Sequence, residues 1–234
     1  MIPDINRRAA LALALTAGTA LAAGCASAAP LSSSAAPRSL QPLPLPFDPM
    51  SIPGLSEKLL TSHHDNNYAG AVRRLGAIGA QLSELNLATA PGFVLNGLKR
   101  EQLIALNSMV LHEIYFDGFA GDARAPGAAL GAQIEADFGS FVRWRDEFAA
   151  MGKALGGGSG WVLLTWSPRL GRLINTWAAD HAMTAADGRV LAALDMYEHA
   201  YAMDYGARAD AYVDAYMAAL RWGAADAAFA PTGG

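Results

Sequence analysis

The segment at residues 195–201 carries an aspartate and a histidine four residues apart, Asp195 and His199, with Glu198 directly before the histidine. The chain has only five histidines, at positions 63, 64, 112, 181 and 199, and they fall in four separated segments. Imidazole and carboxylate groups together make sites for redox metals such as iron or manganese. A fold that uses these side chains jointly must bring distant parts of the chain to one point.

Residues 47–120 have the pattern of a helical domain. Apolar residues recur at three- and four-residue spacing from Ile52 to Ile78, and residues 86–96, which contain Pro91-Gly92, read as a connection. A second helix is predicted from about Lys99 to Phe116. Its expected apolar face is made of Leu103, Leu106, Val110 and Ile114. Two long helices with a short connection predict an αα-hairpin.

Residues 121–230 predict a domain that mixes helices and strands. Helices are expected at about 128–138 and 140–154, with Ser140 as the N-cap of the second. After the glycine-rich residues 156–160, strands are expected at 161–166, 172–178 and 190–196, followed by a helix at 209–221. The fold class is therefore α+β: a long N-terminal α-hairpin, then a C-terminal α/β domain with a three-stranded antiparallel sheet.

Residues 1–28 have the composition of an export signal. Arg7-Arg8 precede an apolar stretch at residues 9–23 and the small residues Ala26-Ser27-Ala28. The paired arginines indicate the twin-arginine route to the periplasm, and an ordinary secretory signal is the alternative. Residues 29–46 are rich in Ser, Ala and Pro, which predicts a disordered linker.

Cys25 is the only cysteine, so an intramolecular disulfide is excluded. It follows Leu21-Ala22-Ala23-Gly24, a loose match to a lipoprotein box, so a lipid anchor at Cys25 is the alternative to its removal with the signal.

The net charge is −4 and the arginines are scattered, so the sequence shows no basic cluster that would indicate a nucleic-acid partner. We expect no membrane span, because no window is apolar over the required length.

Each histidine alone has a simple structural interpretation. His63, His64 and His181 would each be surface residues, and His112 would be a buried, hydrogen-bonded one. Only the joint pattern with Asp195 and His199 indicates a metal site, because those two can face one point across a strand-to-helix turn.

Several motifs resemble those of the iron/manganese superoxide dismutase family. Residues 195–201 are close to the family's Asp-x-Trp-Glu-His-Ala-Tyr, and Gly158-Ser159-Gly160-Trp161 matches its Gly-Ser-Gly-Trp signature. Leu45-Pro46-Phe47, the helix that reaches Ser62-His63-His64, and residues 111–116 around His112 fall at corresponding places in the family pattern. The resemblance covers about residues 45–229.

The resemblance implies an enzyme that converts superoxide to O₂ and H₂O₂ at one Mn or Fe ion per subunit. The metal ligands it implies are His63, His112, Asp195 and His199. It makes His181 the hydrogen-bond donor to the metal-bound solvent, since the alternative source of that donor is Ser108, which is too short.

The resemblance also implies an oligomer. Glu198 matches the residue that bridges to the ligand histidine of a second subunit, which indicates a homodimer or homotetramer through Glu198-His199. Trp161 and Tyr201 are expected beside the site or its interface.

The chain departs from the family at the substrate gate. The usual His and Tyr after the first ligand are Asn67 and Ala71 here, and the Tyr that meets this gate across the dimer is Ala202. Asn67 and Tyr68 are then the candidates to line the entrance. Three tryptophans around the metal are replaced by Phe116, Tyr197 and Leu163.

These departures leave two rival functions open. One is an exported Mn/Fe-binding relative with little dismutase activity. The other is a helical interaction module whose histidines lie in its core, which would purify without metal.

Overall fold

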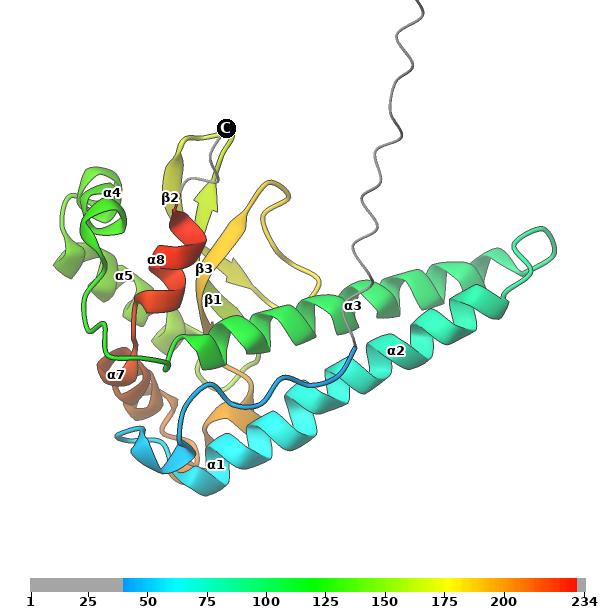
Figure 1. Ribbon diagram of the computed structural model, residues 1–234, viewed down its shortest axis with the longest axis horizontal. Coiled ribbons are helices and arrows are strands. Elements are labelled where there is room, and N and C mark those ends of the chain that lie inside the picture. Colours follow the sequence, from blue (N-terminus) through cyan, green and yellow to red (C-terminus); the bar gives the residue numbers. More distant parts are fainter. Residues whose placement is uncertain (1–39, 231–234) are drawn as a thin grey trace, which may run out of the picture. The chain divides into compact units, whose positions relative to one another are not determined.

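The computed structural model describes residues 40–230, so the predicted export signal, Cys25 and most of the predicted linker lie outside the described residues (Figure 1). Within that part the α+β class is confirmed. N-terminal helices are followed by further helices and by an antiparallel sheet of three strands.

The first long helical run has three parts. After a short 3₁₀ turn, η1 (Pro49–Ser51), come α1 (Glu57–Ser62), a π-helical turn η2 (His63–Tyr68) and α2 (Ala69–Glu84). Ser56 caps the run, because its hydroxyl accepts a hydrogen bond from the Leu59 N–H at 3.0 Å. A 26-residue helix, α3 (Gly92–Asp117), returns beside α2, so the predicted hairpin is present (Figure 1).

The structure corrects two expectations for α3. The helix begins at Gly92 and not near Lys99, because Pro91 serves as its N-cap residue, and proline is tolerated where a helix begins. The expected apolar face is wrong at three of its four positions: Leu103, Leu106 and Val110 are 45%, 41% and 38% exposed, and only Ile114 packs against the core. The buried face lies on Ala105, Ser108, Leu111, His112, Tyr115 and Phe116. This set includes His112, so the helix turns its histidine inward and some of its leucines outward.

The second half contains five α-helices among the described residues. These are α4 (Ala128–Phe138), α5 (Phe141–Ala154), α6 (Ala202–Tyr205), α7 (Ala209–Ala219) and α8 (Gly223–Phe229), with a 3₁₀ turn η3 (Glu198–Ala200) before α6. Ser140 caps α5 as predicted, accepting from the Arg143 N–H at 3.1 Å. The chain turns between α4 and α5 at Gly139, whose φ of +85° suits glycine. Helix α8 was not predicted.

The sheet has the order β2-β1-β3, with β1 (Trp161–Ser167), β2 (Arg172–Ala178) and β3 (Arg189–Asp195). Both pairs are antiparallel, and Trp161 lies opposite Ala178 on one side and Asp195 on the other. A side chain at Gly160 would approach the Ala178 carbonyl oxygen to 2.2 Å, so only glycine fits before β1. The register therefore fixes Asp195 at the end of β3, beside Trp161.

The N-terminal edge of the described chain packs on the helical half. The Leu43 N–H donates to the Tyr68 hydroxyl at 2.9 Å, and the Leu43 carbonyl lies 2.8 Å from His64 Nε2. Phe47 packs edge-on against Phe119 at 5.8 Å. The last residues of the predicted linker, 43–46, thus belong to the folded part. None of the helices in residues 40–230 is long and apolar enough to span a membrane.

Candidate metal centre

Four side chains from four different segments converge at one point. His63 opens the π-helical turn, His112 lies in α3, Asp195 ends β3 and His199 lies in η3. One ligand atom from each lies within 4.8 Å of all the others. His63, His112 and Asp195 are at most 1% exposed. The structure thus brings together the four ligands expected from the sequence.

The carboxylate of Asp195 organises the cluster. Its Oδ2 lies 3.1 Å from His63 Nε2, 3.2 Å from His199 Nε2 and 3.5 Å from His112 Nε2. Its Oδ1 accepts from the Tyr197 N–H at 2.8 Å. With one oxygen anchored to the main chain, the other points at the three imidazoles.

The tautomer of His112 suits a metal ligand. Its Nδ1 lies 2.6 Å from the Ser108 main-chain carbonyl, which can only accept, so Nδ1 carries the proton. The Nε2 atom of His112 is then unprotonated, and its lone pair is buried. This atom and His63 Nδ1 have no hydrogen-bond partner among the described residues. Buried polar atoms are rarely left unpaired. A cation between the histidines and Asp195 would satisfy Nε2 of His112, so the residues fit a bound metal.

The protonation states agree with this fit. Burial lowers the pKa of His112 to about 3, and burial also lowers the pKa of His63. Burial alone would raise the pKa of Asp195, but hydrogen bonds with His199 and His63 outweigh it and hold that pKa well below its usual range. Neutral imidazoles and an ionised carboxylate are the forms that bind metals.

The π-helical turn places the first ligand. It interrupts the run between α1 and α2 at His63–Tyr68, and such turns are often found at functional sites. The neighbour His64 points elsewhere: its Nδ1 lies 2.7 Å from Asp65 Oδ1 and its Nε2 bonds to the Leu43 carbonyl. His64 is therefore not a member of the cluster.

His181 lies beside the cluster with a defined tautomer. The indole N–H of Trp161 donates to His181 Nδ1 at 2.9 Å, so the ring proton of the neutral imidazole is on Nε2. Its ring stacks on Tyr197 at 4.8 Å and lies 6.0 Å from the ring of His112. Burial lowers the pKa of His181, which favours this neutral form.

A cavity of about 280 Å³ opens next to His181. Its walls include Asn67, Ala71, Arg74 and Ser108, which come from the π-helical turn, α2 and α3. Asn67 thus lines a cavity beside His181, and its role at the substrate entrance stays a prediction. With alanine at 71 and serine at 108, the walls of this cavity carry small side chains.

The expectation that Tyr68 lines the same entrance is wrong. Tyr68 is 1% exposed, and its hydroxyl donates to Glu113 at 2.9 Å while accepting from Leu43. It borders a different cavity, of about 120 Å³, together with His64. Because Tyr68 directly follows Asn67 on a helical turn, the two side chains diverge.

Two of the residues that replace the family's tryptophans, Phe116 and Tyr197, lie against the ligands. The ring of Phe116 lies 5.2 Å from His63, and Tyr197 stacks on His199 at 5.4 Å. Leu163 is fully buried in β1. Of the residues expected beside the site or its interface, Tyr201 stacks on Tyr212 at 5.3 Å. Glu198 is exposed on the single chain.

Two tyrosines behind the cluster were missed from the sequence. Tyr115 lies 4.9 Å from the ring of His63, and Tyr212 donates to the Asp195 main-chain carbonyl at 2.8 Å. Their hydroxyls are 3.3 Å apart. The position of Tyr115, three residues after His112 on the same face of α3, is a signal that could have indicated its role. Tyr212 carries no such local signal.

Comparison with known proteins gives the same assignment. Residues 126–228 match the family model "Iron/manganese superoxide dismutases, C-terminal domain". A protein of Cupriavidus metallidurans named superoxide dismutase [Fe] is 63% identical over 187 residues, covering 80% of this chain and 94% of that protein. Superoxide dismutase [Mn] 1 of Halobacterium salinarum and superoxide dismutase [Fe] of Methanothermobacter thermautotrophicus are each 33% identical. Each alignment covers 78% of this chain and 90% of the relative. The chain therefore belongs to the iron/manganese superoxide dismutase family.

Proposed function

We propose that this protein is a superoxide dismutase that converts superoxide to O₂ and H₂O₂ with one iron or manganese ion per subunit. The observation that carries the proposal is the buried cluster of three imidazoles and one carboxylate, with the Nε2 lone pair of His112 left without a partner. The relatives with iron and with manganese in their names support either metal.

The bound ion supplies the one-electron oxidation and reduction that dismutation requires. The residues of the chain supply three further functions. Asp195 contributes the single negative charge that favours the higher oxidation state, and the imidazoles bind without adding charge. Tyr115 and Phe116 cover the ring of the buried ligand His63, and Tyr197 stacks on His199.

We propose that His181 presents its Nε2–H as a hydrogen-bond donor toward the cavity beside the metal cluster. Its Nε2–H is fixed by the Trp161 hydrogen bond at Nδ1, and the ring borders the 280 Å³ cavity, which we propose as the path by which superoxide approaches the cluster. A donor at this place would orient solvent and substrate and would adjust the reduction potential of the ion. Asn67 is proposed as a polar contact for the incoming anion.

Metal content and superoxide consumption, measured on the same purified sample, test the function. We expect about one iron or manganese ion per chain and rapid turnover of superoxide per bound ion. A metal-loaded protein with negligible turnover would instead support the rival function of a metal-binding relative. A protein that purifies without metal and cannot be loaded would contradict both.

We propose that the protein is an oligomer with paired sites. Glu198 is exposed on the single chain next to the ligand His199, which leaves its carboxylate accessible to a second copy. Light scattering should give the mass of a dimer or tetramer, and Glu198→Ala should shift it toward the monomer. A monomeric wild-type protein would contradict this.

We also propose export to the periplasm by the twin-arginine route. The support is the Arg7-Arg8 pair before an apolar stretch, in residues outside the described part. Replacing both arginines by lysine should sharply reduce periplasmic delivery, and unchanged delivery would indicate the general secretory route. Mass spectrometry of the mature N-terminus distinguishes signal removal from a lipid on Cys25.

A further inference from the structure

His181 lies in an irregular segment, residues 179–188, that joins β2 to β3. No helix or strand fixes the main chain at this position. The ring nevertheless has defined neighbours, because its Nδ1 accepts from the Trp161 indole N–H and its face stacks on Tyr197. The position of His181 therefore depends on the few contacts that tie this segment to the rest of the protein.

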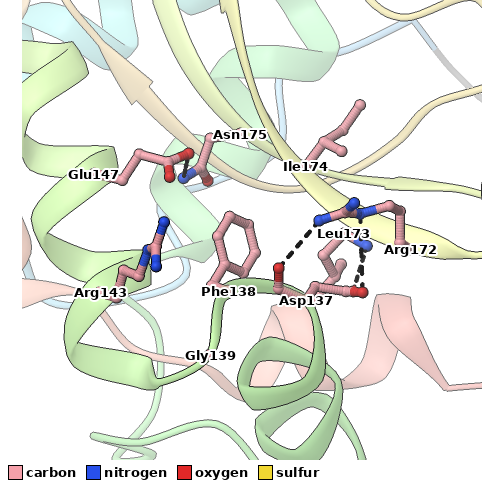
Figure 2. A pocket seen from close by; sticks show the side chains of 9 residues that line it. All are labelled: Asp137, Phe138, Gly139, Arg143, Glu147, Arg172, Leu173, Ile174 and Asn175. Atoms are coloured by element: carbon pink, nitrogen blue, oxygen red, sulfur yellow. Dashed lines mark hydrogen bonds and ion pairs between the residues drawn. The ribbon is translucent and has the colours of Figure 1, made fainter.

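The other end of β2 is tied to its surroundings by several hydrogen bonds. Asp137 Oδ2 accepts from the Leu173 N–H at 2.7 Å, and Arg172 donates to the Asp137 main-chain carbonyl at 3.0 Å (Figure 2). The Asn175 side-chain amide donates to Glu147 Oε1 at 2.9 Å (Figure 2). The start of the strand is thus joined to both α4 and α5.

The segment that follows β2 has fewer such ties. The Ala182 N–H donates to Asp180 Oδ1 at 2.8 Å and the Met183 N–H to the Asp180 carbonyl at 3.4 Å, so both bonds stay within the segment. Among the described residues, a single hydrogen bond joins the main chain of residues 180–186 to another element. It runs from the side-chain amide of Asn107, in α3, to the His181 carbonyl at 2.6 Å.

The contact between Asn107 and His181 has a defined direction and a defined place in α3. A main-chain carbonyl can only accept, so the amide nitrogen of Asn107 faces it. The next residue, Ser108, accepts from Nδ1 of the ligand His112 through its own carbonyl at 2.6 Å. Two consecutive residues of one helix therefore hold the metal ligand and the segment that carries His181. The rings of His112 and His181 lie 6.0 Å apart.

We propose that Asn107 is a positioning residue for dismutation, which holds His181 in place beside the metal cluster and its cavity. This inference rests on the role proposed above for His181. Without the amide, the His181 carbonyl loses its partner, and the ring keeps only the hydrogen bond from Trp161. Small displacements of a group that acts on the reacting atoms can reduce turnover strongly. Asn107 makes no hydrogen bond to a metal ligand among the described residues, so its effect passes through His181.

The variant Asn107→Leu tests the proposal on the full, metal-loaded protein, because leucine has nearly the same shape but no donor. We expect the metal to remain and turnover per bound ion to fall by about tenfold, toward the lower end of the loss expected without His181 itself. The reduction potential should shift in the same direction as in His181→Ala, by a smaller amount. Asn107→Gln keeps an amide on a longer side chain and should restore part of both.

Asn96→Leu is the matched control, because it makes the same substitution at an exposed position of the same helix. It should leave metal content, turnover and potential as in the wild type. A loss in Asn96→Leu equal to that in Asn107→Leu would overturn the proposal. Loss of the metal from Asn107→Leu would also overturn it, since Asn107 would then support the ligands and not His181.

The double variant separates positioning from a general structural role. In the His181→Ala background, Asn107→Leu should cause no further loss of turnover, because no imidazole remains to be positioned. Full additivity of the two losses would show that Asn107 acts independently of His181 and would contradict the proposal.

Hydrogen–deuterium exchange gives a readout that does not depend on turnover. The main-chain amides of residues 181–186 should exchange faster in Asn107→Leu than in the wild type, while those of β1 should not change. Unchanged exchange together with an unchanged potential would overturn the proposal. A wild type without superoxide turnover would contradict the proposed function, while faster exchange in Asn107→Leu would still show that Asn107 holds the segment.

Discussion

The two sides of the metal cluster are built differently. Behind the ligands, Tyr115, Tyr212 and Tyr216 are fully buried, and the hydroxyls of the last two donate to the main-chain carbonyls of Asp195 and Ala193. On the side of His181 lies the cavity of about 280 Å³, whose walls are mostly small and polar residues, with Ile104 and Arg74 as the larger side chains. One side of the cluster is thus closed and aromatic, and the other, the open side, has a cavity next to it.

This difference indicates that holding the metal and admitting the substrate depend on separate residues. The closed side fixes the strand that carries Asp195, so changes there should alter stability and metal retention. On the open side, only the Ser108 carbonyl is hydrogen-bonded to a ligand, His112, among the described residues, so changes at the other residues there should alter turnover. Five variants, in order of expected effect on turnover, test this division.

The largest effect is expected when a ligand is removed. His112→Ala should reduce the bound metal to a small fraction of one ion per chain, because His112 is one of only four side chains that form the ligand group among the described residues. Asp195→Ala should behave similarly. Elemental analysis of the purified proteins measures this. His64→Ala is the control and should keep its metal, because His64 bonds to Asp65 and Leu43 instead. Normal metal content in His112→Ala would refute the ligand assignment.

A smaller effect is expected for His181→Ala. The metal should remain, while turnover should fall by about 10–100-fold, the usual cost of losing a group that acts on a metal through hydrogen bonds. The reduction potential should shift as well, which a purely structural role would not produce. Asp180→Asn, at the adjacent position, serves as the control. Unchanged potential and rate in His181→Ala would show that the ring has no role on the open side.

A still smaller loss of turnover is expected for Ala71→Leu. The larger side chain should partly fill the cavity and lower kcat/KM by about tenfold or less, equivalent to at most about 1.4 kcal/mol in the barrier. Metal content should not change. Ala77→Leu places the same substitution at an exposed position of α2 and should be neutral. If filling the cavity left kcat/KM intact, access to the metal would have to follow another path.

The smallest effect on turnover is expected on the closed side, for Tyr212→Phe. This change removes the hydrogen bond to the Asp195 carbonyl and should lower the free energy of unfolding by about 1–3 kcal/mol, while turnover per bound metal stays close to normal. Urea unfolding measures it. Tyr201→Phe, whose hydroxyl makes no hydrogen bond among the described residues, should cost less. A turnover defect larger than the stability defect would contradict the division between the two sides.

Much of this fold could be predicted from local pattern. The boundaries of β2 and the cap at Ser140 follow from short-range chemistry, since strand composition and capping depend on neighbouring residues. The full set of four ligands was predicted from the resemblance to the superoxide dismutase family, while the local pattern by itself pointed only to Asp195 and His199. The motif around Asp195 places its two ligands four residues apart, and no other segment of the chain offers that pairing.

Other features depend on tertiary contacts that no local pattern encodes. The buried face of α3 follows Ala105, Ser108 and His112, because the cluster and α2 lie on that side, while Leu103 and Leu106 remain exposed. Tyr68 turns toward Leu43 and Glu113, partners 25 and 45 residues away. Hydrophobicity alone predicts the opposite arrangement for α3, and sequence adjacency to Asn67 misplaces Tyr68.

Because the ligands are far apart along the chain, only a correctly folded chain can bind the ion. His63 and Asp195 are 132 residues apart, and they meet only when the helical run is docked and β3 is paired in register with β1. A chain with β3 shifted by one residue would turn Asp195 to the other face and could not assemble the set. Free metal at about 1,000 times its dissociation constant adds about 4.1 kcal/mol to the correctly folded chain alone. A cell with ample metal would thereby hold more of the chain in the native conformation. The melting temperature of the protein would then depend on the free metal concentration as well as on the sequence.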